Sequence, residues 1–245
     1  MFIFGFQLIH RLRLKMVAHI VTVLFSAFMI YTAWPGSSLF SWHPTLMTFA
    51  FGAALWEALL VFNKESSIFV NVTRPTKVLV HQILGITAVA SSLLGFAAIY
   101  YNKEFNEKPH FVTWHGLMGL IAVVFVTIQS FGGDLVKYEW LRKLVGVNKS
   151  LAVLKIYHAT AGLVAFTLVM ATMMLALYST WFTSQVGWIM WMLCNGCVSF
   201  MAVIVMNQVV AEYLPRTRGS YQPVTATNTN TKSTTKFTNK KKKRN

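Results

Sequence analysis

The stretch Val78–Tyr101, VLVHQILGITAVASSLLGFAAIYY, decides the fold class of this chain. It contains no charged side chain, and a helix needs about 20 mostly apolar residues to cross a bilayer. Lipid cannot satisfy exposed backbone groups, so a segment of this kind must be helical. Its single histidine, His81, lies near its start, and a histidine in a membrane span is costly unless something binds it.

Apolar stretches of this kind occur six times, and together they predict six transmembrane helices. The chain has 245 residues, is 55% hydrophobic and has a mean hydropathy of +0.53, which is too apolar for an ordinary soluble domain. We therefore predict an all-α membrane protein with one membrane domain, residues 1–214, and a disordered basic cytoplasmic tail, residues 215–245. The five other spans are expected at Met16–Trp34, Leu46–Phe62, Val112–Phe131, Val153–Tyr178 and Val186–Val210.

The net charge of +15 is unevenly distributed along the chain, which argues against nucleic-acid binding. With the N-terminus in the cytoplasm, twenty of the 22 Lys and Arg residues fall on the cytoplasmic side, and only Lys103 and Lys108 fall on the other. This asymmetry follows the positive-inside rule, so both termini are expected in the cytoplasm. The final basic run, Lys240–Arg244, is either a solvated segment attracted to anionic lipid or a dilysine retrieval signal for the endoplasmic reticulum.

Four histidines near the starts of four consecutive spans form two candidate pairs. His43 and His115 belong to spans that enter from the non-cytoplasmic side, whereas His81 and His158 belong to spans that enter from the cytoplasm. The topology therefore pairs His43 with His115 in one leaflet and His81 with His158 in the other, inside a four-helix core of spans two to five. These pairs predict two non-covalent haems b with two axial histidines each. Such haems carry electrons, because no axial position is left open for oxygen.

Glycines near the histidines have two interpretations. Gly85, Gly119 and Gly162 each follow a histidine by four residues and so share its helix face. They either leave room for a porphyrin or allow close packing between helices. A second group, Gly132 and Gly133, is expected to end the fourth span.

Two further polar residues lie in or near the spans. Glu57 is the only acid well inside a span, and an intramembrane carboxyl is a functional candidate by default. It either hydrogen-bonds near the cytoplasmic haem, takes up a proton or makes a neutral packing contact. His19, at the start of the first span, is expected at the membrane interface.

The residues around the four histidines resemble the cytochrome b561 family, especially one of its short branches. The similarity covers nearly the whole membrane region and leaves out the basic tail. It is carried by the segments PGSSLFSWHP (35–44), EALLVF (57–62), KPHFVTWHGL (108–117), KIYHATAGLV (155–164), WFT (181–183) and MNQV (206–209).

This resemblance implies a transmembrane ascorbate-dependent reductase whose four histidines bind two haems b. It implies ascorbate as the cytoplasmic electron donor, and monodehydroascorbate or ferric chelates as acceptors on the lumenal or extracellular side. Lys77 and His110 are the substrate contacts that it suggests, although Lys77 also follows the positive-inside rule and His110 has a plain interfacial alternative. Relatives also suggest a homodimer and a location in endoplasmic reticulum or vesicle membranes.

Two other functions fit the same four histidines. A quinol-linked cytochrome b subunit would need a partner subunit and would be reduced by quinol instead of ascorbate. A haem-free transporter would use the histidines to relay protons or to bind a metal ion, and it would show no Soret band.

Overall fold

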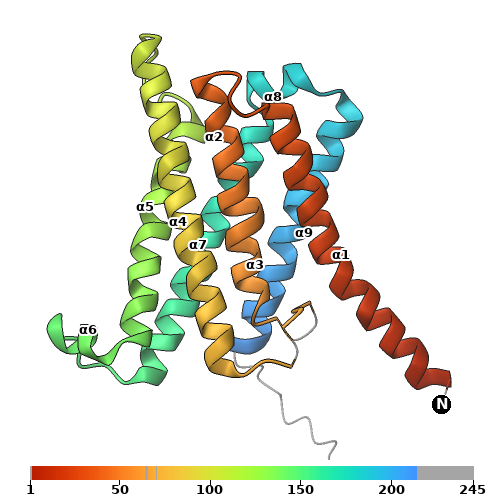
Figure 1. Cartoon of the computed structure of the whole chain (residues 1–245), viewed down its shortest axis with the longest axis vertical. Coiled ribbons are helices and arrows are strands. Elements are labelled where there is room, and N and C mark those ends of the chain that lie inside the picture. The colour runs from red at the N-terminus through yellow and green to blue at the C-terminus, as the bar shows by residue number, and fades with distance from the viewer. Residues whose placement is uncertain (1, 64–65, 70, 214–245) are drawn as a thin grey trace, which may run out of the picture. The chain divides into compact units, whose positions relative to one another are not determined.

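Long apolar helices make up most of the membrane region (Figure 1). The computed structural model describes residues 2–63, 66–69 and 71–213, and within these the side chains from Met16 to Val210. The predicted tail, residues 215–245, lies outside this part. Among the described residues, five helices are long and apolar enough to cross a membrane, namely α1 (Phe2–Ala33), α4 (Arg74–Phe105), α5 (Trp114–Lys137), α7 (Leu151–Leu177) and α9 (Trp188–Tyr213).

The second expected span is helical but is divided into three consecutive segments. They are α2 (Leu39–Met47), the π-helix η1 (Thr48–Ala54) and α3 (Leu55–Leu60), and they follow one another without a break. The helix begins seven residues before the predicted start at Leu46. Ser38 explains this difference, because it caps α2 and forms a capping box with Ser41. Pro44 lies inside α2, so it does not mark the boundary that a proline usually indicates.

Side-chain caps also set the start of three of the long helices. Thr73, Thr113 and Ser150 accept hydrogen bonds from backbone N–H groups three residues later, at the first turns of α4, α5 and α7. The prediction that Gly132 and Gly133 end the fourth span is wrong, because α5 continues through both glycines to Lys137. The short helices α6 (Glu139–Leu144) and α8 (Thr180–Gln185) lie in the connections that follow α5 and α7.

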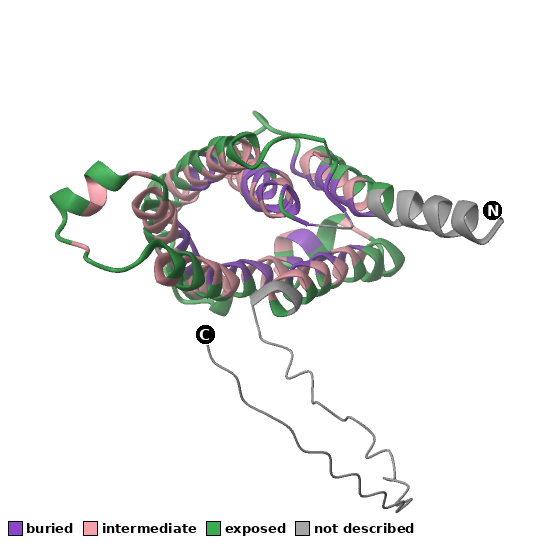
Figure 2. Ribbon diagram, turned by 90° about the horizontal axis from the view of Figure 1, so that it is seen from below, coloured by how far each residue is buried: buried purple, intermediate pink, exposed green. Residues whose placement is uncertain are grey.

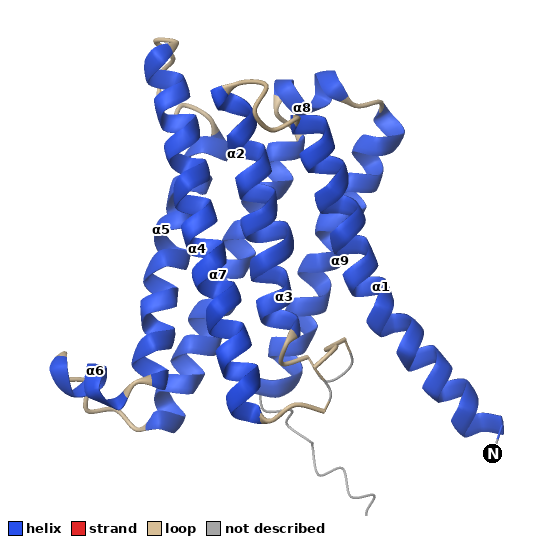
Figure 3. Ribbon diagram, viewed as in Figure 1, coloured by secondary structure: helices blue, strands red, loops and turns tan. Residues whose placement is uncertain are grey.

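The described helices pack in a closed order around the bundle. α1 packs on η1 and α2, which pack on α4; α4 contacts α5, α5 packs on α7, α7 on α9, and α9 returns to α1. Figure 3 shows loops at the two ends of this bundle. We call the end with α8 and the Asn106–Thr113 connection the outer end, and the end with α6 and the Val61–Thr73 connection the inner end (Figure 1).

The outward faces of the long helices are apolar, as a lipid-facing surface requires. Leu24, Leu94, Ile128 and Val203 are each more than half exposed although they lie near the middle of their helices. Figure 2, viewed from below, shows exposed residues mainly on the outside of the bundle and buried ones on faces between helices. The prediction of an all-α integral membrane bundle is therefore confirmed. The count of six spans stays a prediction, because each of the three segments of the second span is too short to cross a membrane alone.

Candidate functional site

The outer histidine pair joins α2 and α5. The ring centroids of His43 and His115 are 6.1 Å apart, with an angle of 76° between the ring planes. Nδ1 of His43 donates to the carbonyl oxygen of Gly95 on α4 at 3.0 Å, and Nδ1 of His115 donates to that of Thr172 on α7 at 3.1 Å. Each Nδ1 therefore carries a proton, and Nε2 is the nitrogen left for a metal.

The inner histidine pair joins α4 and α7 with nearly the same geometry. The centroids of His81 and His158 are 6.2 Å apart and their planes are 88° apart. Nδ1 of His81 donates to the carbonyl oxygen of Ala58 on α3 at 2.8 Å. His158 differs, because its Nδ1 faces the side-chain amide of Gln129 on α5, with Nε2 of that amide at 2.9 Å.

The anchors of the histidines follow a reciprocal pattern. In the first hairpin, α4 anchors His43 and α3 anchors His81; in the second, α7 anchors His115 and α5 anchors His158. Three of the helices carry both a histidine and an anchor for a histidine of another helix. In each of them the two positions are fourteen residues apart. These three combinations are His81 with Gly95, His115 with Gln129, and His158 with Thr172.

The π-helix explains why the second span keeps this register with one more residue. His43 and Ala58 are fifteen residues apart, and η1 lies between them. A π-helical turn takes up an extra residue inside an otherwise α-helical span. Fourteen residues of α-helix rise about 21 Å, so the outer and inner pairs lie at two levels separated by roughly that distance.

The spacing of each pair fits one metal ion between two imidazoles. A metal held at about 2.0–2.1 Å from each nitrogen, with roughly 1.1 Å from nitrogen to ring centre, separates the centroids by about 6.3 Å. The observed centroid distances, 6.1 and 6.2 Å, agree with this value. Space beside the rings also fits a flat group, since a Cβ at Gly85 would meet nothing within 4 Å and one at Gly119 only Thr172 Cγ2 at 3.4 Å. The residues present therefore fit a bis-histidine haem at each level.

The glycines near His158 serve a different purpose from Gly85. A Cβ at Gly162 would lie 3.0 Å from Nε2 of Gln129, so this glycine admits the anchoring amide. A Cβ at Gly133 would lie 3.1 Å from Cε1 of His158. Gly133 thus lets the imidazole approach the backbone of α5, which is why a glycine pair stands inside a helix that it was expected to end.

A buried aromatic pair lies between the two levels. The rings of Trp56 and Phe166 stack with centroids 6.4 Å apart, and both side chains are almost completely buried. Phe166 follows His158 by eight residues and precedes Thr172 by six, so it lies between the inner and outer levels of α7. Aromatic side chains therefore pack between the two levels.

The two candidate substrate residues lie at opposite ends of the bundle. Lys77 is half-buried in the first turn of α4, one helical turn before His81. At the outer end, Nε2 of His110 contacts Oε1 of Glu104 at 2.8 Å, and its ring stacks on Tyr100 with centroids 4.3 Å apart.

A polar cluster lies beside the inner pair, on the neighbouring residues of α4 and α5. Nε2 of Gln82 donates to Asp134 Oδ1 at 2.9 Å and to the Tyr138 hydroxyl at 3.1 Å, and Lys137 donates to Gln82 Oε1. The hydrogen bond with Gln82, and then that with Lys137, lowers the pKa of Tyr138. This cluster ties the inner ends of α4 and α5 together next to His81.

His19, which is expected at the membrane interface, has a partner within the protein. Its side chain is only 13% exposed, and Nδ1 lies 2.8 Å from Oε1 of Glu57. Glu57 therefore has a partner from another helix, α1, which the sequence analysis did not foresee. Both residues are polar side chains in apolar segments, and that is the feature that could have paired them.

Comparisons with known proteins agree with this geometry. The sequence profile of eukaryotic cytochrome b561 matches residues 42–183, a range that contains all four histidines. The chain belongs to the cytochrome b561 family. It is 41% identical to the transmembrane reductase CYB561D2 of Bos taurus and to that of Homo sapiens over 201 residues, which is 82% of this chain and 89% of either relative. It is 33% identical to the probable transmembrane reductase CYB561D1 of Mus musculus over 82% of this chain and 86% of that relative. Haem binding is general in cytochromes b561, so the fit of both histidine pairs to haem has a direct explanation.

Proposed function

We propose that this cytochrome b561 is a transmembrane reductase that passes single electrons from cytoplasmic ascorbate to monodehydroascorbate or ferric chelates on the other side. The observation that supports this most directly is the presence of two histidine pairs of matching geometry at two levels of one bundle. The names of its relatives, which are transmembrane reductases, support the same reaction class.

In this proposal the protein's own residues hold and orient the electron carriers. His43 and His115 would hold one haem b, and His81 and His158 would hold the other. The bound haems supply one-electron chemistry. The Nδ1 anchors fix the orientation of the imidazoles, and Trp56 and Phe166 keep the region between the levels packed. Because two histidines would hold each haem, the chemistry supplied there would be electron transfer and not oxygen binding.

The two ends of the bundle provide the proposed substrate sites. Lys77, near His81, places a positive charge where an ascorbate anion arrives. His110 lies at the outer end and is the residue that we propose for contact with the acceptor. Both termini would be cytoplasmic, in an endoplasmic reticulum or vesicle membrane, and two copies of the chain would form a homodimer.

Stopped-flow absorbance in sealed vesicles of known orientation tests this function. We expect the purified protein to hold two haems b, and ascorbate on the inner side to reduce both before a ferric chelate on the outer side reoxidises them. A colourless protein, or one that holds a single haem when saturated, would contradict the proposal. Reduction by quinol without reduction by ascorbate would favour a quinol-linked subunit instead.

The orientation has its own test in two glycosylation sequons. Asn71-Val72-Thr73 and Asn148-Lys149-Ser150 both lie at the inner end. If this end is cytoplasmic, neither asparagine is modified in cells, and mass spectrometry finds both unglycosylated. A glycan at either position would show that the inner end faces the lumen or the outside of the cell, opposite to the predicted orientation.

A further inference from the structure

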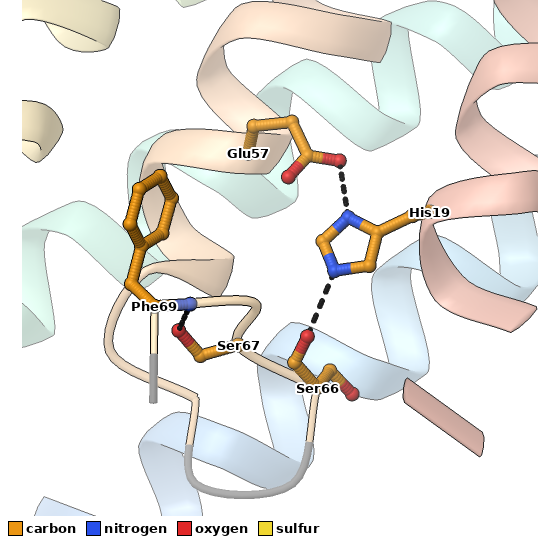
Figure 4. A network of polar contacts seen from close by, with 5 residues as sticks. All are labelled: His19, Glu57, Ser66, Ser67 and Phe69. Atoms are coloured by element: carbon orange, nitrogen blue, oxygen red, sulfur yellow. Dashed lines mark hydrogen bonds and ion pairs between the residues drawn. The ribbon is translucent and has the colours of Figure 1, made fainter. Parts of the chain in front are cut away.

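A histidine and a glutamate from different helices meet at the inner end of the bundle (Figure 4). They are not part of the inner histidine pair. Nδ1 of His19, on α1, lies 2.8 Å from Oε1 of Glu57, on α3, and Nε2 of His19 lies 2.8 Å from the carbonyl oxygen of Ser66. The side chains are 13% and 26% exposed. Glu57 is also the only acid well inside the expected spans.

The hydrogen bonds determine how many protons this pair holds. The carbonyl of Ser66 can only accept, so Nε2 of His19 carries a hydrogen. The short contact between Nδ1 and the carboxyl then requires one more proton between them, on either the imidazole or the carboxyl. Without that proton, two lone pairs would face each other at 2.8 Å. The contact between α1 and α3 therefore depends on one exchangeable proton.

The pair is linked to the inner histidines through the backbone. Glu57 immediately precedes Ala58, whose carbonyl accepts the hydrogen bond from Nδ1 of His81. The ring of Phe62, one turn further along, lies 5.3 Å from the ring of His81. A change of charge on Glu57 therefore changes the electrostatic potential at the adjacent residue, whose carbonyl bonds His81. Such an effect is stronger inside a protein than in water.

Few other described side chains at this level can compete for the proton. On α4, the charged or titratable groups near the inner end are Arg74, Lys77 and His81. Along α1 from Met16 and along α9 up to Val210, the remaining titratable side chains are nearer the outer end, at Tyr31, Cys194 and Cys197. The described residues of the connection are neutral, with Asn63 and Gln208 bonded to each other; Lys64 and Glu65 lie outside the described part.

We propose that His19 and Glu57 form a redox-linked proton site, an inference that rests on the proposed function. When an ascorbate monoanion gives up one electron, it also gives up one proton and becomes the ascorbyl radical anion. The electron enters the inner site, and the His19–Glu57 pair takes up the one proton that its contact requires, so the net charge of the inner end does not change. When the electron moves to the outer pair, Glu57 and His19 return the proton to the inner side. The pair thereby offsets the electrostatic cost of placing an electron inside the membrane.

The test is the pH dependence of the midpoint potential of the inner haem, measured by optical titration between about pH 5 and 8, where imidazole changes charge. A fully linked proton changes the potential of a one-electron couple by about 59 mV per tenfold change in proton activity. We expect a clear slope for the inner haem in the wild type and a much smaller slope in Glu57→Gln, because glutamine cannot bind the proton. The slope of the outer haem should be the same in both proteins.

Glu104→Gln is the matched control, because Glu104 also contacts a histidine at 2.8 Å, but at the exposed outer end. It should leave the slope of the inner haem as in the wild type. A constant offset between wild type and Glu57→Gln with equal slopes would overturn the inference, since it would reflect lost charge alone. If Glu57→Gln loses haem, proton uptake by an indicator dye in His19→Gln decides, and an unchanged number of protons per electron overturns the inference. A wild type with fewer than two haems would overturn the proposed function as well.

Discussion

At the outer pair both histidines donate to main-chain carbonyls, whereas at the inner pair only His81 does, and His158 depends on the Gln129 side chain. The centroid distances of the two pairs differ by only 0.1 Å, so the same ligand geometry arises from different supports. A main-chain carbonyl is present whatever the residue. An amide side chain is specific to Gln and Asn, and it can either donate or accept.

The inner site therefore depends more on individual side chains than the outer site does. Gln129 needs the space at Gly162, and the imidazole of His158 needs the space at Gly133. The inner level also has the hydrogen-bonded pair of His19 and Glu57 and the ring of Phe62 beside His81, while both histidines of the outer level have main-chain anchors. We infer that the main-chain path alone fixes the orientation of the histidines at the outer site. At the inner site, this orientation also depends on the side chains at a few positions.

Deleting one residue between the two levels has the largest expected effect. Removal of Ala88 from α4 rotates everything beyond it by about 100° relative to His81, so Gly95 no longer faces His43. We expect the haem content of the purified protein to fall at both levels. Removal of Ala53 from η1 should do much less, because it leaves fourteen residues between His43 and Ala58, as on the other helices. Equal haem loss from the two deletions would contradict the role assigned to the π-helix.

Substitution of a single histidine distinguishes the inner haem site from the outer one. His81→Ala removes one of the two imidazoles of the inner pair and leaves the outer pair and its anchors intact. We expect about half the haem of the wild type by the pyridine haemochrome assay, and no electron transfer across vesicles. His43→Ala should remove the other half. Equal loss of both haems from a folded His81→Ala protein would contradict the proposed pairing.

The fold and the four histidines could be predicted from sequence because both depend on local patterns. Apolar stretches of fixed length mark helices in a membrane, and the alternating direction of the spans brings His43 near His115 and His81 near His158. The start of α2 was placed too late because the prediction followed the apolar stretch from Leu46, whereas the Ser38 cap begins the helix at Leu39, before Pro44.

The supports of the site could not be predicted in the same way. Three anchors are carbonyls of Gly95, Ala58 and Thr172, and a backbone carbonyl leaves no trace in the sequence. Gln129 was overlooked although it is a polar residue in a span and lies fourteen residues after His115. Gly133 was taken for a helix end, since glycine indicates both termination and close approach until the neighbouring helix is known.

Filling the space at Gly133 should weaken the inner site selectively. In Gly133→Ala the new Cβ would lie 3.1 Å from His158 Cε1, so the imidazole must move away from its position opposite His81. We expect roughly a 10- to 100-fold loss of haem affinity at the inner level, as for other disturbances around a metal ligand. Gly196→Ala in α9 is the control, because its Cβ would meet nothing within 4 Å. Haem titration of the apoprotein measures both, and a loss confined to the outer level would contradict the prediction.

Replacing Gln129 should have the smallest effect, a shift in the midpoint potential of the inner haem. The sign of this shift is informative. For His158 to bind iron through Nε2, its Nδ1 must carry the proton, so the amide must turn its oxygen toward the ring. In the structure Nε2 of Gln129 faces this Nδ1 and also donates to the carbonyl oxygen of His158 at 2.6 Å, so the turn also gives up that second hydrogen bond. Gln129→Glu strengthens that acceptor, makes the imidazole a stronger ligand and lowers the inner midpoint potential; Gln129→Leu removes it and raises the potential. A hydrogen bond of about 1 kcal/mol corresponds to roughly 40 mV for a one-electron couple.

Redox titration should show these opposite shifts at the inner haem with the outer haem unchanged, because the outer anchors are carbonyls that neither substitution touches. Shifts of the same sign in both variants would mean that Gln129 only fills space beside Gly162.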